Sequence, residues 1–335
     1  MKRTMFMMSL GLFLVIMLST SPVSSQTVEI KLAHGGPPAM ALQKAALHFQ
    51  KYLDLATGGT MKVAIFPAGQ LGNERVMAEG VQHGTIQMAI LSDVILSNFV
   101  PQVGVMTLPF LFPNREAVYK VQDGEIGRKL FSLFPEKGMV ALAWGENGFR
   151  NFVNAKKPIK TLSDMKDLKM RCMEGAIYID SFKALGINPV PMPWAETINA
   201  IKQGVVDGTD LPYNAILLTG MYEAAKYITD IKWVYSGLVM VANKGFYDAL
   251  TADQKRLLRE AAFEFQLMNR SIDATDAMSS REQLLQKGAQ ITDVGPKDRA
   301  LYRTATQKVH QEWMKKLGED LIKSIYKEVE KYEYE

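Results

Sequence analysis

The chain has 335 residues with 39 basic and 35 acidic side chains, giving a formal net charge of +4. This small, scattered excess gives no support to nucleic-acid binding through a basic surface. The single cysteine, Cys172, excludes an internal disulfide, so the fold must be held together by its hydrophobic cores. The length is sufficient for two domains with separate cores.

Residues 1–25 predict a cleaved signal peptide. Lys2 and Arg3 are followed by an apolar run at 5–18 and by small residues at 23–25. The alternative is a membrane anchor, but the run is shorter than the ~20 residues of a spanning helix. We therefore expect export, cleavage after Ser25 and release of a soluble chain.

The N-terminal half alternates predicted strands and helices. We expect strands at 28–33, 61–66, 86–91, 139–144 and 145–153, and helices at about 39–56, from about 73, and in two stretches between 114 and 133. The segment 86–91 is continuously apolar, which is typical of a strand covered on both faces. It ends at Ser92 and Asp93.

The C-terminal half continues in the same rhythm. We expect strands at 169–173, 188–192, 234–242 and 289–294, and helices at 176–185, 194–203 and 213–226. Pro296 opens a final helix or helix pair to the C-terminus, and Ser163 or Asp164 caps a short turn. Thr251 and Gln254 predict a capping box for a long helix to about Lys287. That helix either bridges two domains or kinks near 269–271. The pattern predicts two α/β lobes joined by structured crossovers.

The stretch LKMRCMEGA (168–176) places Arg171 beside Cys172. In a strand the two side chains point to opposite faces, so we expect Cys172 to pack in a core. The alternative is an exported enzyme with Cys172 as nucleophile. A thiol nucleophile needs a positioned base, and the four histidines are scattered. We expect no enzymatic activity.

Metal and nucleotide motifs are absent from the sequence, so we expect no cofactor and no metal site. Two arginines, Arg171 and Arg150, lie in or beside apolar strands. Each could pair with an internal carboxylate such as Glu146 or Glu174, or grip a ligand carboxylate in a cleft. Aromatic residues at strand ends and helix starts suggest a partly apolar cavity: Phe66, Phe149, Trp194 and Tyr213.

Several longer motifs then occur in a familiar order: FPAGQLGNER (66–75), TLPFLF (107–112), NGFRNF (147–152), KPIKTLSDMKDLKMR (157–171), LGINPVPMPWAETINAIKQGVVDGTDLP (185–212) and YEAAKYI (222–228). Over essentially the whole mature chain, the sequence resembles the DctP-type extracytoplasmic solute-binding proteins of tripartite ATP-independent periplasmic (TRAP) transporters. The resemblance implies a two-lobed, Venus-flytrap α/β fold in the periplasm. It also implies closure on a carboxylate-bearing solute and delivery to membrane permease subunits driven by an ion gradient.

The resemblance assigns the carboxylate clamp to Arg171, in the GLKxR strand, and a second arginine to Arg150, in NGxR. Trp194 occupies the segment after PxPM that often packs on the ligand. The family often reads VDGxEN, whereas this chain ends in Asp210 and Leu211. Because Leu211 cannot donate a hydrogen bond, we expect that contact to be lost or replaced by Tyr213 or Asn214.

The full predicted ligand site is His34, Phe66, Ser92, Asp93, Phe149, Arg150, Arg171, Trp194, Asp210, Leu211, Tyr213 and Asn214. Because the site has few polar contacts, the first-choice ligand is a monocarboxylate with an apolar or aromatic body. A C4-dicarboxylate is second, a sugar acid is disfavoured, and a sensor-associated role is an alternative to transport.

We expect lobe I to comprise 26–147 plus about 236–275, and lobe II about 148–235 plus 276–335. The long connecting helix would join the two lobes. The protein is expected to be a monomer or a homodimer.

Overall fold

The structure, a computed structural model, describes residues 27–333, so the predicted signal peptide lies outside the described residues. The described strands form one mixed sheet of nine, in the order β2-β1-β3-β8-β4-β7-β5-β6, with β9 paired to β8. Their bounds are β1 (Val28–His34), β2 (Met61–Phe66), β3 (Met88–Ser92), β4 (Met139–Asn154), β5 (Lys169–Cys172), β6 (Asn188–Pro191), β7 (Gly208–Leu211), β8 (Tyr227–Asn243) and β9 (Gln290–Asp293). A single sheet therefore extends through both lobes.

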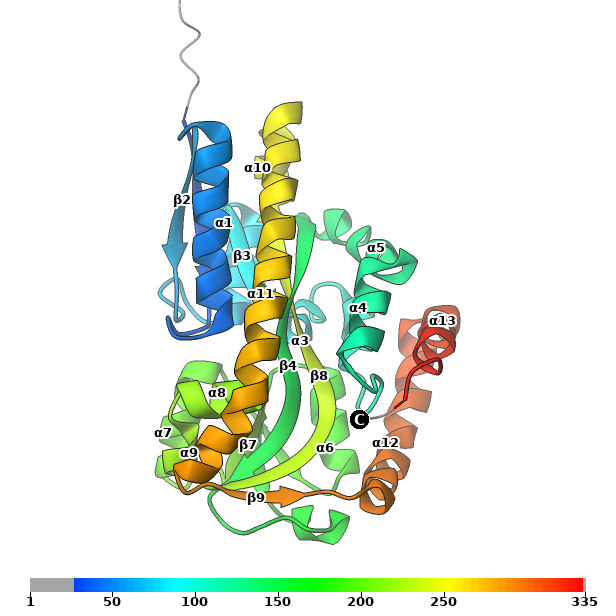
Figure 1. Ribbon diagram of the computed structural model, residues 1–335. Helices are drawn as coiled ribbons and strands as arrows, with labels where there is room; N and C mark the ends of the chain where they lie inside the picture. The colour runs from blue at the N-terminus through cyan, green and yellow to red at the C-terminus, as the bar shows by residue number, and fades with distance from the viewer. Residues whose placement is uncertain (1–26, 334–335) are drawn as a thin grey trace, which may run out of the picture.

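The antiparallel pair β4 and β8 connects the lobes (Figure 1). At one end β3 pairs with residues 238–242 of β8, and at the other end β7 pairs with residues 151–154 of β4. The predicted strands at 139–144, 145–153 and 234–242 are confirmed as strand, but the predicted break at 144/145 and the start at 234 are wrong, because β4 and β8 are each one long strand. A bulge at Asn147 lets β4 continue through a segment whose glycines suggested a break.

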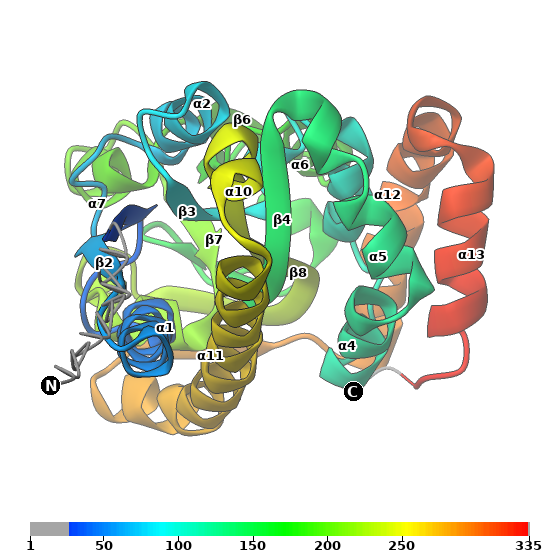
Figure 2. The same cartoon turned by 90° about the horizontal axis from the view of Figure 1, so that it is seen from above.

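Helices cover the sheet on both sides (Figures 1 and 2). The α-helices up to the long one are α1 (Ala41–Thr57), α2 (Glu74–His83), α3 (Asp93–Leu96), α4 (Arg115–Asp123), α5 (Glu125–Phe131), α6 (Ala176–Ala184), α7 (Thr197–Lys202), α8 (Tyr213–Leu218), α9 (Met221–Ala224) and α10 (Lys244–Ala249). Phe49 and Leu53 of α1 belong to a core cluster with Leu258 and Phe265. The prediction of a two-lobed α/β fold is confirmed: one mixed sheet extends through both lobes and α-helices cover it.

Helix α11 (Ala252–Gln286) spans both lobes and is continuous through 269–271 (Figure 1). It packs on α1 at one end and on α8 at the other. The predicted capping box is confirmed: the Thr251 hydroxyl accepts from Gln254 N at 3.2 Å, and Gln254 Oε1 accepts from Thr251 N at 2.9 Å.

Two predicted helix boundaries are wrong. The segment 213–226 is not one helix, because Gly220 adopts a left-handed φ of +70° and separates α8 from α9. The short turn at Leu162–Met165 is capped by Thr161, with Asp164 as the reciprocal partner of a capping box, rather than by Ser163 or Asp164.

The chain ends in α12 (Pro296–Leu317) and α13 (Glu319–Val329), separated at Gly318. Tyr302 of α12 packs in the core around Trp233, whereas Ile322 and Ile325 of α13 pack in the core that contains Val118 of α4. Figure 2 shows α13 outside α4 and α5. The lobe limits given above stay a prediction, and α12 contacts both cores.

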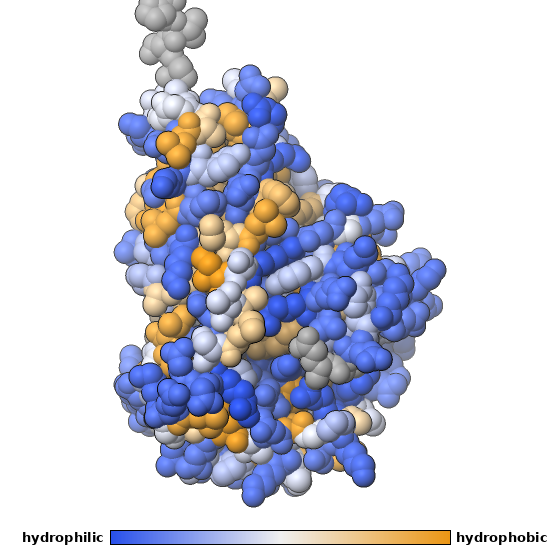
Figure 3. All heavy atoms as spheres, in the orientation of Figure 1, coloured by the Kyte–Doolittle hydropathy of each residue, from blue (hydrophilic) through white to orange (hydrophobic). Residues whose placement is uncertain are grey.

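Apolar side chains remain exposed on α1 and α11, among them Leu55 and Phe263. On the face shown in Figure 3 the apolar areas are interspersed with hydrophilic ones. Across residues 27–333 we find no helix with the length and hydropathy that crossing a membrane requires.

Candidate ligand-binding site

A cavity of about 250 Å³ lies between the lobes, where the loops after β1, β2, β5 and β7 meet the middle of β4. The carboxyl ends of parallel strands are a common place for ligands in open α/β sheets. The wall is largely apolar and includes Met40, Met77, Ile95, Trp194, Leu211 and Leu238. The ionisable side chains of the wall are Glu74, Arg150, Arg171 and Glu174.

Arg171 lies at the end of β5 and is 3% exposed. Its Nε donates to Met192 O at 3.1 Å, and its guanidinium carbon lies 5.9 Å from the Trp194 ring centroid. Between residues 27 and 333 no carboxylate lies within ion-pair distance of Arg171. Burial, and then the charge of Arg150, lower the pKa of Arg171 to about 10. The group is still charged at neutral pH, and among residues 27–333 the carboxylates of Asp210 and Glu74 act on it only from beyond ion-pair distance.

Arg150 has the same 3% exposure but an internal partner. Its Nε donates to Asp210 Oδ2 at 2.7 Å and its Nη2 to Asp210 Oδ1 at 3.2 Å. Trp233 Nε1 also donates to Asp210 Oδ2, at 3.2 Å. Burial acts to lower the pKa of Arg150, but the Asp210 carboxylate outweighs it and raises that pKa. The internal-carboxylate alternative thus applies to Arg150, with Asp210 rather than Glu146 or Glu174 as partner.

Cys172 follows Arg171 on β5 but points into a core with Met170, Phe182 and Trp233. The prediction that it is a buried core residue is confirmed. Burial raises the pKa of the Cys172 thiol to about 12, so the thiol is protonated at neutral pH. The two side chains therefore serve opposite faces of β5.

Glu74, at the start of α2, is a cavity residue absent from the prediction. It accepts hydrogen bonds from the backbone N of Ser92, at 3.3 Å, and from the Ser92 hydroxyl. Burial raises the pKa of Glu74, while these bonds and the charges of Arg171 and Arg150 oppose that rise. The motif FPAGQLGNER contains Glu74, so the sequence did carry a signal for it.

Four of the twelve predicted site residues line the cavity: Arg150, Arg171, Trp194 and Leu211. Three others, Ser92, Asp93 and Asp210, lie behind the cavity wall. The Ser92 hydroxyl donates a hydrogen bond to Glu74, and Asp210 accepts one from Arg150. Asp93 accepts from Gly237 N at 2.9 Å and from Val94 N at 2.8 Å. Burial raises the pKa of Asp93 to about 8, although both bonds and Arg150 act in the opposite direction.

The other five predicted residues are not part of the described cavity wall: His34, Phe66, Phe149, Tyr213 and Asn214. His34 Nε2 is 2.7 Å from Gln43 Oε1, and burial lowers the pKa of His34. Phe149 packs edge-on against Tyr235. Asn214 was one of the two residues expected to bind the ligand in place of the asparagine that the family often has at position 211. Its Nδ2 instead donates to Asp273 Oδ1 at 2.5 Å.

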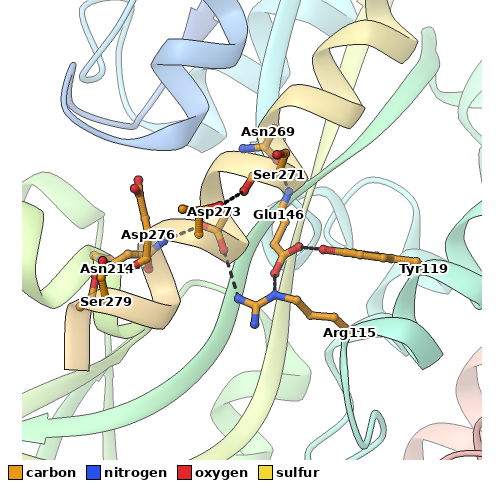
Figure 4. Close-up of polar contacts among 12 residues, drawn as sticks. Arg115, Tyr119, Glu146, Asn214, Asn269, Ser271, Asp273, Asp276 and Ser279 are labelled. Carbon is orange, nitrogen blue, oxygen red and sulfur yellow. Dashed lines mark hydrogen bonds and ion pairs between the residues drawn. The ribbon is translucent and has the colours of Figure 1, made fainter. Parts of the chain in front are cut away.

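Behind β4, a polar network joins three helices to the strand (Figure 4). Arg115 of α4 donates through Nε to Glu146 Oε1, at 2.5 Å, and through Nη2 to Asp273 Oδ2, at 3.4 Å. Tyr119 donates to Glu146, and Asn214 of α8 to Asp273. Burial, and then Glu146, raise the pKa of Asp273 well above its usual range. This network, defined by these five residues, is called the waist network below.

Over residues 27–333 we find no group of three or more histidine, cysteine or acidic side chains placed to hold a metal ion. The cavity wall between the two lobes thus combines two arginines, two glutamates and two asparagines with apolar side chains.

A two-lobed α/β fold with a cavity between the lobes is the architecture of a solute-binding protein. Residues 32–317 match the DctP family, described as bacterial extracellular solute-binding protein, family 7, and the chain belongs to this family. A solute-binding protein of Verminephrobacter eiseniae (strain EF01-2) is 35% identical over 278 residues, which are 83% of this chain and 82% of that protein.

Two solved structures illustrate the similarity. The sugar acid binding protein DctPAm from Advenella mimigardefordensis, in complex with galactonate, has a TM-score of 0.89 and 28% identity, covering 91% of this chain and 99% of its own. A TRAP periplasmic solute-binding protein from Bordetella bronchispeptica, with density assigned to pantoate, has a TM-score of 0.86 and 34% identity, covering 90% and 99%. The chain is thus an extracytoplasmic solute-binding protein of the TRAP type.

Proposed function

We propose that this protein captures an organic acid with one carboxylate and a largely apolar body, for uptake by a TRAP transporter. The observation that carries the proposal is Arg171, a buried charge at the cavity that makes no ion pair with any residue between 27 and 333. An unpaired buried charge costs several kcal/mol, so an anion from outside would be strongly favoured there. A guanidinium also matches the planar fork of a carboxylate.

The charge of the wall favours a single carboxylate. Glu74 and Glu174 line the cavity beside the arginines, and Asp210 already compensates Arg150. Arg150 Nη1 remains without a partner among residues 27–333, so it can donate a second bond to the same ligand carboxylate. A second carboxylate on the ligand would meet acidic side chains, which makes a C4-dicarboxylate the weaker choice.

The apolar wall supports an apolar ligand body. Trp194 lies beside Arg171, and Leu211 and Met40 add further hydrophobic surface. Burial of apolar area contributes about 25 cal/mol for each Å² removed from water. Galactonate and pantoate, named for the two similar structures, are both organic acids.

Transport would follow from closure of the lobes around the ligand. Ligand contacts from both lobes favour the closed state, which the permease subunits can recognise. β4, β8 and α11 run through both lobes and are the elements that must bend. The predicted signal peptide would deliver the chain to the periplasm. The alternatives are a sensor-associated role and a Cys172-dependent enzyme, and the protonated, buried thiol argues against the second.

The test combines a ligand screen with one substitution. Monocarboxylates, C4-dicarboxylates and sugar acids are screened by thermal shift, since a ligand at 100 times its Kd adds about 2.7 kcal/mol of stability. For the best ligand, calorimetry should show that Arg171→Ala lowers affinity at least tenfold, because a charge-assisted hydrogen bond contributes about 1.5–3 kcal/mol.

Arg256→Ala is the matched control, since Arg256 is an exposed arginine of α11 paired with Glu260. It removes the same charge far from the cavity and should leave affinity unchanged. Equal affinity of the wild type and Arg171→Ala for a verified ligand would contradict the clamp. Preferential binding of a dicarboxylate would contradict the proposed ligand class.

A further inference from the structure

The bulge in β4 determines which side chains of this strand reach the cavity. Glu146 pairs with Gly237 and Gly148 with Ser236, so Asn147 is an extra residue on β4. In a regular strand, residues three apart face opposite sides. The extra residue reverses that relation: Asn147 and Arg150 both line the cavity. Glu146 and Phe149 contact the opposite side, where Glu146 meets α4.

The waist network keeps this backbone in place from behind. Gly148 adopts a φ of +92°, which side-chain-bearing residues rarely adopt. A Cβ at Gly148 would lie 3.0 Å from Asp273 Oδ2 and 3.3 Å from Arg115 Nη2. The backbone N of Glu146 donates to Asn269 Oδ1 at 2.5 Å. The backbone on both sides of Asn147 therefore lies close to the waist network, and Figure 4 shows Glu146 hydrogen-bonded within it.

The side-chain amide of Asn147 is a polar group of the cavity wall. It is half-buried and has no hydrogen-bond partner within residues 27–333. The other amide of the wall, Asn73, caps α2 by accepting from Val76 N at 3.0 Å. Asn214 is engaged by Asp273. A partly buried amide gains from a partner, because leaving its donor and acceptor unpaired on ligand binding is unfavourable.

We propose that Asn147 is a specificity-determining residue that hydrogen-bonds to a hydroxyl or oxo group on the ligand body. The ligand class is then a hydroxy- or oxo-substituted monocarboxylate rather than a plain fatty or aryl acid. The inference rests on the proposed function, because it takes the carboxylate to be held by Arg171. It adds the second polar group of the ligand, which Leu211 cannot bind and which Asn147 can.

The experiment compares three acids with one carbon skeleton: isovalerate, 2-hydroxyisovalerate and 3-hydroxyisovalerate. Calorimetry measures the affinity of each for the wild type, Asn147→Leu and Asn188→Leu. Leucine has the size of asparagine without its polar atoms, and Asn188 is an exposed residue of β6 outside the cavity wall. The wild type and the control should prefer one hydroxy acid over isovalerate at least tenfold.

In Asn147→Leu this preference should fall below threefold while the affinity for isovalerate is retained. The two hydroxyl positions show where along the ligand the amide reaches. An unchanged preference in Asn147→Leu, or equal wild-type affinity for all three acids, overturns the inference while acid binding itself stands.

Arg171→Ala separates the two proposals, because it should weaken all three acids in parallel. If the wild type binds none of the three acids, the inference for this class is overturned. The clamp is then judged on the wider organic-acid screen.

Discussion

Arg150 and Arg171 lie in the same cavity wall and are equally buried, yet their surroundings differ. Arg150, in the middle of β4, is held by the Asp210 carboxylate from neighbouring β7. Arg171, at the end of β5, contacts a backbone carbonyl and the face of Trp194 and makes no ion pair within the described part of the chain. The local sequence of each is an arginine in an apolar strand, so the difference comes entirely from the neighbouring chain segments.

This contrast separates two roles for a buried arginine. A compensated arginine is part of the folded structure before any ligand arrives, and it can add a bond to the ligand at little electrostatic cost. An uncompensated one lowers the stability of the empty protein and regains that energy when an anion binds. The three predictions below test whether this division is correct.

The largest expected effect is on stability, from Arg150→Ala. The variant leaves Asp210 buried with Trp233 as its remaining side-chain donor, and breaking a buried pair in this way costs about 3–5 kcal/mol. Chemical denaturation of the ligand-free protein measures the free energy of unfolding. The double variant Arg150→Met with Asp210→Asn should recover most of the loss. A loss below about 1 kcal/mol for Arg150→Ala would show that the pair is not structural.

A pH effect at Asp93 sharpens the comparison, because Asp93 senses the charge of Arg150. Its folded pKa of about 8 lies above the ~3.9 of an unfolded chain, so the folded state binds the proton more tightly. The resulting stabilisation is complete below about pH 4 and is lost as the pH rises to about 8. Between pH 5 and 9, stability should therefore shift in favour of Asp93→Asn by at least about 1.4 kcal/mol, the equivalent of one pKa unit.

Denaturation curves of the wild type and Asp93→Asn at several pH values measure that difference, and any constant effect of the amide cancels. If the difference is independent of pH, the Arg150 charge keeps Asp93 ionised. Asp210 would then not be compensating Arg150 fully.

The smallest expected loss of stability is that of Arg171→Met in the ligand-free protein. Removing a buried charge that makes no ion pair among residues 27–333 should leave the free energy of unfolding unchanged or raise it. Denaturation without ligand, in parallel with Arg150→Ala, gives the comparison directly. A loss as large as that of Arg150→Ala would mean that Arg171 has a structural partner and is no ligand clamp.

Much of the fold could be predicted from local sequence. The strands at 28–33, 61–66 and 188–192, the capping box at Thr251 and the burial of Cys172 all follow from patterns within a few residues. The continuity of β4 could not be predicted, because the glycines around Asn147 indicate a turn unless a partner strand is known. The break at Gly220 was missed, because a single glycine within an apolar helical pattern is compatible with either outcome.

The candidate site was less accessible from the sequence. Arg171, Arg150, Trp194 and Leu211 line the cavity, whereas Phe66, Phe149 and Asn214 do not. An aromatic residue at a strand end can face a core as readily as a cleft, and only packing decides between them. Glu74 lies at the start of a helix and Asn147 in a bulge, and the direction of each side chain depends on the elements packed around it.

The sequence by itself determined the family, the two-lobed α/β class and the presence of two arginines in strands next to a cleft, because these follow from ordered motifs and periodicity. Only the tertiary structure decided that Asp210 pairs with Arg150 and that Arg171 makes no ion pair with the residues the structure describes. The reason is physical: β7 pairs with β4 and brings Asp210 to Arg150 across 60 residues of chain. Whether a charged side chain of the cavity wall has an internal ion-pair partner depends on such strand pairings, and a short stretch of sequence does not reveal them.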